Sequence, residues 1–146
     1  MREIRTEIDI TAQPEKVWSI LTDASHYPEW NPFITSAEDG FAVGRKIRIH
    51  CEPPNGRPMS FHPICLERNE NQTLRWRGSL GIRGLFDGEH IFELESVGES
   101  KTRFVQREKF SGILVPLVWS SMAANTRKGF EMMNQKLKER AERNSR

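Results

Sequence analysis

The stretch EHIFELESVGESKTRFVQREKF, residues 89–110, decides the fold because it alternates on both sides of a turn signal. In residues 89–95 the even-numbered side chains are His90, Phe92 and Leu94, and three of the four odd-numbered ones are glutamates. In residues 103–110 basic side chains dominate the odd-numbered positions. Alternation with period two is typical of half-buried β-strands. Because the charged faces need water, the even-numbered face of both strands is predicted to point into the protein.

The register of this hairpin follows from the same parity. Opposed residues of an antiparallel pair lie on one face of the sheet, so inward residues must oppose inward residues. A three-residue loop, 98–100, with Val97 opposite Lys101, satisfies this condition. A two-residue turn would place inward residues opposite outward arginines, so we expect it to be excluded. The predicted cross-strand pairs are Leu94 with Phe104, Phe92 with Gln106 and His90 with Glu108.

The sequence before this hairpin also predicts strands joined by short turns. TLRWRG, from Thr73, places Leu74 and Trp76 inward, and RKIRIHC, from Arg45, places Ile47, Ile49 and Cys51 inward. Asp39-Gly40, Asn55-Gly56 and residues 69–71 are turn signals. The short connections favour antiparallel neighbours. MSFHPICLE, residues 59–67, is apolar on both faces, so the orientation of His62 and Cys65 stays open.

Helices are expected at the two ends of this strand-rich region. Residues 2–10 alternate like a strand, residues 14–23 form a short amphipathic helix, and a second helical turn follows Ser25. Pro116 can open a final long helix. Its apolar stripe, at spacings of three and four, is Ala123, Thr126, Phe130, Met133, Leu137 and Ala141. One helix about 10 Å wide cannot fill a long curved sheet, so a cavity should remain between them.

Composition excludes several classes of protein. The chain has 146 residues, 36% hydrophobic and 29% charged, which fits one globular domain over residues 1–146. No apolar run is long enough for a membrane span, and the charged N-terminus is not a signal peptide, so we expect a cytoplasmic protein without stable membrane insertion. A net charge of +2 does not indicate nucleic acid, and the basic excess after Arg127 is interpreted as a solvated helix face.

Cysteine and histidine usage indicates neither a disulfide framework nor a metal site. Cys51 and Cys65 lie on consecutive predicted strands, where a bridge is sterically conceivable, but we expect both to remain thiols. The four histidines show no metal-binding spacing, so no metal or other cofactor is expected.

One aromatic segment falls where the backbone must be irregular. HYPEWNPFI, residues 26–34, contains two prolines together with Tyr27, Trp30, Phe33 and Ile34. Two interpretations stay open. Trp30 and Phe33 either close one end of a pocket, where a loop can move, or plug the core beneath a loop.

Several motifs in order carry a family resemblance: VWSILTDASHYPEWNPFI, LRWRG, GLFDGEHIFEL and FVQREKFSGILVPL. With the order of elements, they resemble the START-related helix-grip superfamily, also named SRPBCC, and within it the polyketide cyclase/dehydrase-like branch. The resemblance implies an α+β helix-grip fold. A seven-stranded antiparallel sheet would wrap around the C-terminal helix, with two short helices after the first strand and a ligand cavity between sheet and helix.

Strand and helix parity predict most of the lining of that cavity, which is apolar with three polar interruptions, and the resemblance implies that the segment with Trp30 and Phe33 lies near its mouth. The predicted ligand-binding residues are Trp30, Phe33, Ile47, Ile49, Trp76, His90, Phe92, Phe104, Gln106, Glu108, Phe110, Met122, Thr126 and Met133. Apolar cavities with a few placed polar groups are the usual form of small-molecule sites.

Three classes of function remain open. The favoured one is binding of a hydrophobic or amphipathic small molecule, such as a lipid, a polyketide-like compound or another aromatic metabolite, by a monomer or weak homodimer. The second is a cofactor-independent cyclase or dehydratase with His90 and Glu108 as acid–base candidates, although these two side chains could instead form a satisfied polar pair in the wall. The third is a partner-binding module, which no exposed apolar stripe singles out.

Overall fold

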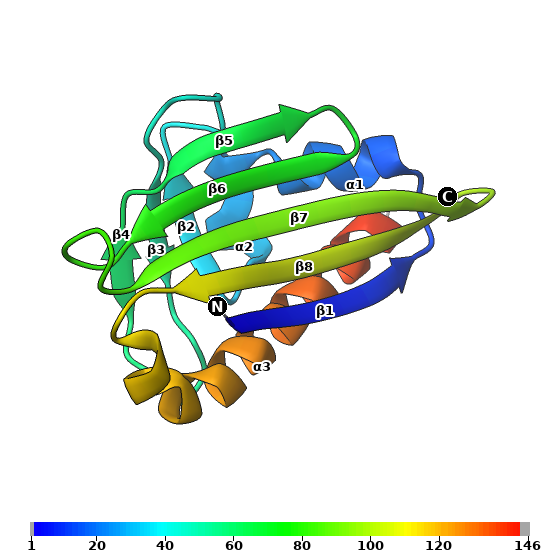
Figure 1. The fold of residues 1–146 in the computed structure, drawn as a ribbon. Coiled ribbons are helices and arrows are strands. Elements are labelled where there is room, and N and C mark those ends of the chain that lie inside the picture. Colours follow the sequence, from blue (N-terminus) through cyan, green and yellow to red (C-terminus); the bar gives the residue numbers. More distant parts are fainter. Residues whose placement is uncertain (1, 144–146) are drawn as a thin grey trace.

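Five antiparallel strands build the main sheet, in the spatial order β1-β8-β7-β6-β5 (Figure 1). The computed structural model describes residues 2–143. The strands are β1 Arg2–Ile10, β5 Ile64–Asn69, β6 Thr73–Ser79, β7 Asp87–Gly98 and β8 Lys101–Ser111. Strands β5 to β8 follow one another as a meander, and β1 joins the edge beside β8. The expected antiparallel meander is confirmed.

A second, shorter sheet continues the curve of the first. It contains β2 Ile34–Glu38, β3 Arg48–Cys51 and β4 Met59–Phe61. Residues 44–47 join it to the main sheet, because Ile47 N–H donates to Pro63 O at 2.8 Å and Cys65 N–H donates to Arg45 O at 3.0 Å. Together the two sheets form the curved wall of the expected helix-grip fold.

The strand count differs from the predicted seven at one place. Residues 59–67, whose orientation the sequence left open, contribute to two strands, β4 and β5, separated by His62 and Pro63. Proline has no N–H to donate, so the ladder cannot run through it. The break lets β4 pair with β3 while β5 pairs with β6. It also settles two open orientations, since His62 is exposed and Cys65 is buried.

The long helix α3, Val115–Arg143, crosses behind the main sheet (Figure 1). Pro116 stands in its first turn, as predicted. Of the predicted stripe, Phe130, Met133, Leu137 and Ala141 are fully buried. The short helices α1 Pro14–Leu21, η1 Ala24–His26 and α2 Tyr27–Trp30 follow β1, as expected. They cover the same side of the sheet as the C-terminal half of α3 (Figure 1).

The hairpin between β7 and β8 has the predicted cross-strand pairs. Leu94 opposes Phe104, Phe92 opposes Gln106 and His90 opposes Glu108. The predicted three-residue loop is wrong, however. Gly98 opposes Lys101 across a two-residue turn, and Val97 is the extra residue of a bulge between Ser96 and Gly98. A bulge adds one residue to one strand, so it corrects the parity that a two-residue turn alone would have violated.

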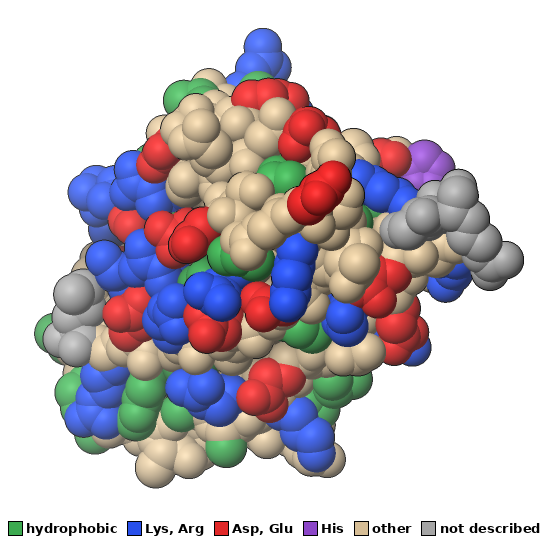
Figure 2. Space-filling model, turned by 90° about the vertical axis from the view of Figure 1, so that its right-hand side faces the viewer, with side chains coloured by type: hydrophobic (Ala, Val, Ile, Leu, Met, Phe, Trp, Pro, Cys, Tyr) green, Lys and Arg blue, Asp and Glu red, His purple; other side chains and the backbone are tan. Residues whose placement is uncertain are grey.

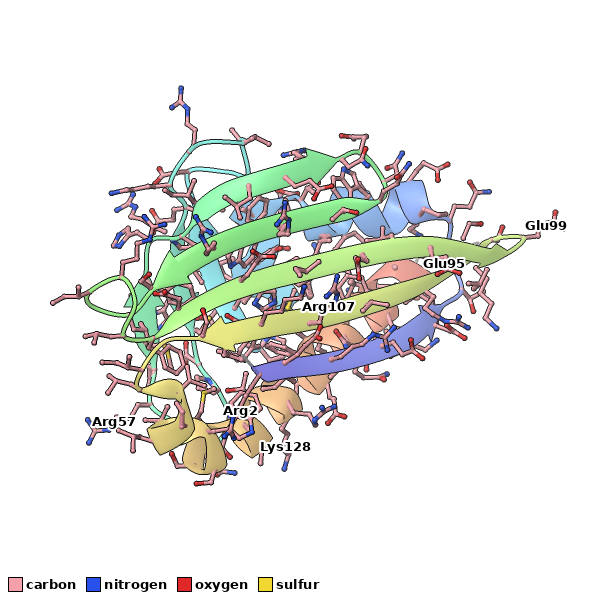
Figure 3. All side chains as sticks on the ribbon, viewed as in Figure 1. Arg2, Arg57, Glu95, Glu99, Arg107 and Lys128 are labelled. Atoms are coloured by element: carbon pink, nitrogen blue, oxygen red, sulfur yellow. The ribbon has the colours of Figure 1, made fainter. Side chains whose placement is uncertain are left out.

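The outer face of the main sheet carries the charged side chains, as alternation requires. Arg107 lies on this face (Figure 3), with Nε 2.9 Å from Glu93 Oε1 and Nη1 3.0 Å from Glu3 Oε2. These ion pairs connect β8 to both neighbouring strands. Ile91 and Val105 share this face, and each is less than a tenth exposed beside the long charged side chains.

Candidate functional site

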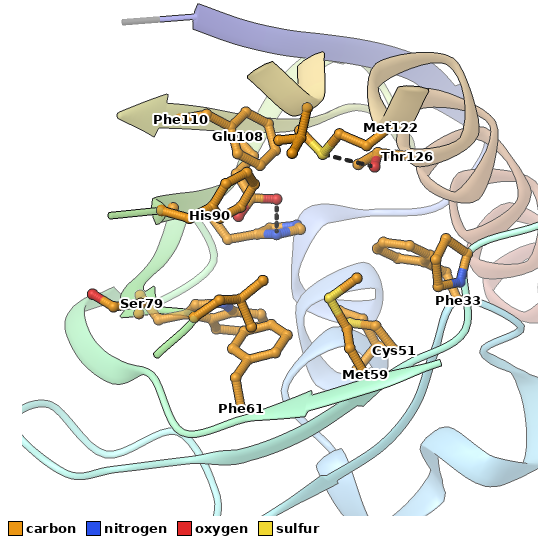
Figure 4. Close-up of a pocket in the computed structure, with 18 of the residues that line it drawn as sticks. Phe33, Cys51, Met59, Phe61, Ser79, His90, Glu108, Phe110, Met122 and Thr126 are labelled. Atoms are coloured by element: carbon orange, nitrogen blue, oxygen red, sulfur yellow. Dashed lines mark hydrogen bonds and ion pairs between the residues drawn. The ribbon is translucent and has the colours of Figure 1, made fainter. Parts of the chain in front are cut away.

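A cavity of about 370 Å³ lies between the curved sheets and the N-terminal half of α3. Its wall is mainly apolar, and Figure 4 shows His90 and Glu108 in it, with Phe110 and Met122 on one side and Met59 and Phe61 on the other. The lining residues are Phe33, Ile34, Cys51, Pro53, Met59, Phe61, Trp76, Gly78, Ser79, Leu80, Phe86, Gly88, His90, Glu108, Phe110, Leu114, Val118, Met122 and Thr126.

The cavity ends where the middle of α3 meets the segment that contains Phe33. Gly129 has no side chain, and a β-carbon there would overlap the Phe33 ring. Phe33 therefore sits directly on the helix, 5.5 Å from the Phe130 ring centre in an edge-to-face arrangement. Asn31 fixes the irregular backbone, because its Oδ1 accepts hydrogen bonds from the N–H groups of Phe33 and Ile34. Beyond this contact α3 is packed, and before it the cavity is open.

Half of the sequence-predicted site residues line the cavity. These are Phe33, Trp76, His90, Glu108, Phe110, Met122 and Thr126. The other half point inward but lie in the packed core away from the cavity: Trp30, Ile47, Ile49, Phe92, Phe104, Gln106 and Met133. The parity of a residue predicts which face of the sheet its side chain is on. It does not predict where along the strand the helix moves away from the sheet and the cavity begins. Trp30, for example, packs edge-to-face on Tyr27, 5.3 Å away.

Twelve lining residues were missed, and signals for several were present. Gly78 and Gly88 have the inward parity of Trp76 and His90. Leu114 and Val118 continue the spacing of four backward from Met122 and Thr126. Extending each pattern toward the end of its element would have found Gly78, Gly88 and Val118, and one further step would have reached Leu114, directly before α3. The residues from loops and from β4, such as Pro53 and Met59, carry no periodic signal.

His90 and Glu108 form the polar centre of the wall. His90 Nδ1 lies 3.3 Å from Glu108 Oε1, as Figure 4 shows with a dashed line. The imidazole is 3% exposed and surrounded by the rings of Phe92, Phe130 and Trp76, with centres at 4.6, 5.0 and 5.2 Å. Because His90 is buried among these rings, its polar contacts with Glu108 and Gln106 are stronger than they would be at the surface.

A chain of buried hydrogen bonds leads from His90 to β1. His90 Nε2 lies 2.9 Å from Gln106 Oε1. Gln106 Nε2 donates to Asn134 Oδ1 at 2.8 Å, and Asn134 Nδ2 donates to Thr6 Oγ1 at 2.9 Å. The Thr6 hydroxyl donates to the backbone carbonyl of Gln106 at 2.9 Å. The chain thus joins β1, β7, β8 and α3.

The polarity of this chain follows from its last acceptor. A carbonyl oxygen can only accept, so Thr6 must donate to it and accept from the Asn134 amide. Each amide then presents its oxygen to the next donor toward the cavity, and Gln106 presents Oε1 to His90. His90 must therefore carry a proton on Nε2. The fold selects the tautomer of this histidine, which is the usual role of such a partner.

The contact between His90 Nδ1 and Glu108 Oε1 is attractive when the imidazole also carries a proton on Nδ1. With Nε2 protonated, a neutral imidazole has only a lone pair on Nδ1, which would repel a carboxylate oxygen. With the proton on Nδ1 the two side chains form an ion pair, which is neutral as a unit, and this suits its burial. A group of this kind can release or accept a proton inside an apolar cavity.

Two further features shape the polar end of the cavity. A β-carbon on Gly88 would overlap Glu108 Oε2, so the glycine makes room for this carboxylate. Cys51 also lines the cavity. Burial, and secondarily the Glu108 carboxylate, raises the pKa of the Cys51 thiol well above its usual value. Cys51 and Cys65 are both free, and Cys51 stays a neutral thiol rather than a nucleophilic thiolate.

Two other kinds of feature are absent from residues 2–143. Within that range no three His, Cys, Asp or Glu side chains are grouped so that they could hold a metal ion. Of the helices described there, none has both the length and the apolar character needed to cross a membrane.

Comparisons with solved structures give the same fold. An aromatase/cyclase from a Streptomyces species superposes with a TM-score of 0.80 at 15% identity, covering 99% of this chain and 96% of that one. A protein from Thermus thermophilus gives 0.78 at 20% identity, covering 99% and 100%. A START superfamily protein from Mycobacterium smegmatis gives 0.72 at 22% identity, covering 97% of each chain. At these identities the likeness shows the fold alone.

Sequence comparison identifies the family of the chain, which the shared fold alone does not. A search of curated protein sequences found no match. The family described as "Polyketide cyclase / dehydrase and lipid transport" matches residues 1–142, nearly the whole chain. Together with the helix-grip fold and its cavity, this match shows that the chain belongs to the polyketide cyclase/dehydrase and lipid transport family.

Proposed function

We propose that this protein binds a small hydrophobic or amphipathic molecule in the cavity between the sheets and α3. The observation that carries the proposal is an apolar cavity interrupted by one buried ionisable pair, His90 and Glu108. A family whose description includes lipid transport supports it. Apolar walls supply affinity, and a single polar group selects the orientation of the occupant.

The size and chemistry of the cavity limit the ligand. A volume of about 370 Å³ is at the lower end of ligand sites and equals roughly a dozen water molecules at about 30 Å³ each. We expect a compound of one or two rings or a short acyl chain. Glu108 Oε1 faces His90, so Oε2 is the oxygen left to accept a hydrogen bond. A ligand with one hydroxyl group should therefore bind better than its hydrocarbon.

A matched pair of ligands tests both parts of the proposal. Calorimetry with 2-naphthol and naphthalene should show binding of both, with 2-naphthol tighter by about tenfold, the worth of one hydrogen bond to a charged group. Glu108→Gln should remove most of this preference while naphthalene binds as before. Native mass spectrometry of the purified protein should also show a co-purified small molecule. An empty protein that binds neither compound would contradict the proposal.

A second candidate function is acid–base catalysis on a polyketide-like substrate, as in a cyclase or dehydratase. The specific observation in its favour is the contact between His90 and Glu108, two ionisable side chains 3.3 Å apart in the wall of an apolar cavity. Glu108 would remove a proton from the carbon next to a substrate carbonyl, and His90 would hold the carboxylate in place. The fold shared with an aromatase/cyclase supports this candidate.

Turnover by variants distinguishes the enzyme from the binding protein. With a polyketide-like substrate that the wild type converts, Glu108→Gln should lower kcat by about a hundredfold or more, because the base is lost. His90→Ala should lower it as well. Near-wild-type turnover by both variants would end the catalytic assignment and leave ligand binding intact.

A further inference from the structure

Exposed aliphatic side chains gather around the mouth of the cavity. Ile82, Ile113 and Leu117 are 72%, 72% and 76% exposed, the highest values among the large apolar residues of the described chain. They stand on two segments, residues 80–86 and 112–118. Leu80 and Leu114, from the same segments, are partly exposed and also line the cavity. The apolar wall thus continues from the cavity onto the outer surface.

The two segments are held together by their own hydrogen bonds. Ile113 N–H donates to Gly84 O at 3.1 Å, and Leu114 N–H donates to Leu85 O at 2.9 Å. The start of α3 leaves little backbone in need of water, because Val115 N–H donates to Gly112 O, Leu117 and Val118 N–H donate to Leu114 O, and Pro116 has no N–H. A surface whose N–H groups are satisfied internally can enter a water-poor environment at low cost.

Two exposed arginines accompany this apolar surface. Arg83 lies between Ile82 and Gly84 in the first segment, and Arg57 lies on the neighbouring loop. That loop contacts α3, since Asn125 Nδ2 donates to Asn55 O. Within residues 2–143 neither arginine has a carboxylate within 4 Å, and both are exposed; Arg83 is close enough to Asp87 to help lower the pKa of that carboxyl group. Figure 3 shows Arg57 and Glu99 at opposite ends of the molecule.

The far end of the molecule has a different surface. Figure 2 shows Lys and Arg side chains intermingled with Asp and Glu there. Several of these charges are paired, for example Lys138 with Glu142 and Arg103 with Asp9. A mixed, paired surface suits water, whereas exposed aliphatic tips beside exposed arginines suit a lipid interface with anionic headgroups.

We propose that the mouth end docks peripherally on an anionic lipid surface. Ile82, Ile113 and Leu117 enter the boundary between headgroups and acyl chains, and Arg57 and Arg83 contact lipid phosphates. The two aliphatic segments stand out as loop and helix tips, a shape that suits insertion into lipid. If the cavity binds a hydrophobic molecule as proposed above, docking places the mouth of the cavity against the lipid bilayer, in which hydrophobic molecules dissolve.

Co-sedimentation with lipid vesicles tests the docking surface without any ligand. The wild type should bind vesicles of phosphatidylcholine with added phosphatidylglycerol, and binding should weaken as salt rises. Ile82→Ser with Leu117→Ser should lower the affinity by about tenfold or more, because two inserted aliphatic side chains are lost. Arg83→Gln should reduce binding and its salt dependence.

Matched controls lie away from the mouth. Met132→Ser removes an exposed apolar side chain of α3 that is 15 residues after Leu117, about 22 Å along the helix. Lys101→Gln removes a cation at the opposite hairpin. Both should bind vesicles as the wild type does. Equal binding by the wild type and the double serine variant would overturn the proposal, as would no binding to any vesicle. Sedimentation velocity provides a further outcome. If the wild type forms a dimer, the double variant is monomeric and neither binds vesicles, the surface is assigned to a protein partner.

Discussion

Gly88 positions the polar pair of the cavity because it has no side chain. The Glu108 carboxylate occupies the space where a β-carbon on Gly88 would stand. His90, two residues along the same strand, holds the other oxygen of that carboxylate. The polar centre of the cavity thus depends on a residue that takes no part in any hydrogen bond with the pair.

Gly88→Ala should displace Glu108 without unfolding the protein. The methyl group would push the carboxylate away from His90, so the imidazole nitrogen signals of His90 should change in NMR spectra. Overpacking of this size costs about 1–3 kcal/mol of unfolding free energy. Gly98→Ala, on the same strand, is the control, because its β-carbon would meet only Lys101 Cβ at 3.8 Å. Unchanged His90 signals in Gly88→Ala would contradict the role assigned to the glycine.

Asn134 is the residue through which α3 joins the buried hydrogen-bond chain. It accepts from Gln106 and donates to Thr6, and it is 2% exposed. Asn134→Leu should lower the free energy of unfolding by about 1–3 kcal/mol or more, because the Gln106 amide loses its best acceptor. Gln135→Leu, one residue along on the exposed face, should change stability by less than about 0.5 kcal/mol. Urea unfolding measures both; similar values would show that the chain adds nothing to stability.

At the scale of elements, α3 has two halves with different environments. Its C-terminal half packs fully, with Met133, Leu137 and Ala141 buried against β1 and α1. Its N-terminal half borders the cavity through Val118, Met122 and Thr126, and Leu114, directly before the helix, continues this wall. The contact of Phe33 with Gly129 and Phe130 separates the two halves. One continuous helix therefore serves as core in one half and as cavity wall in the other.

Substitutions one turn apart should separate these two environments. Phe130→Ala should lower the free energy of unfolding by about 3–5 kcal/mol, because its ring is fully buried among Phe33 and His90. Thr126→Val should change it by less than about 1 kcal/mol, since Thr126 borders open space, and should instead alter ligand affinity. Chemical denaturation and calorimetry measure these effects. A large loss of stability in the valine variant would show that the site is packed and not open.

Across the whole molecule, packing decreases from the hairpin end toward the cavity mouth. The cavity lies toward the mouth end, and Ile82, Ile113 and Leu117 surround its opening, with Arg57 and Arg83 exposed on neighbouring segments. The structure at that end has fewer buried contacts to hold it, and local stability follows such contacts.

Amide exchange should report this gradient directly. Residues 80–86 should exchange faster than residues 130–137 in the free protein, because few apolar contacts hold the loop closed. A ligand that fills the cavity should slow exchange in residues 80–86, and Glu108→Gln with 2-naphthol should reduce that effect. Equal protection of the two segments in the free protein would be inconsistent with a mouth that opens locally.

The sequence by itself determined which faces of the strands point inward and which strands are neighbours. Alternation in residues 89–110 was enough to place His90 opposite Glu108, because a slip of one residue would bury arginines. The bulge at Val97 escaped prediction, since parity constrains the register but not the way in which the turn achieves it. The break between β4 and β5 at Pro63 could have been predicted from the sequence, because proline has no backbone N–H to donate a hydrogen bond to a neighbouring strand.

Only the tertiary structure decided where the cavity lies and what its polar pair contacts. Inward parity is the same for Phe92, in the packed core, and for Gly88, in the cavity wall, because periodicity carries no distance between sheet and helix. That distance is set by Phe33 seated on Gly129, two residues 96 positions apart. The tautomer of His90 likewise depends on a hydrogen-bond chain that starts at Thr6, in the first strand. Such properties arise from contacts between distant segments, and local sequence patterns do not encode them.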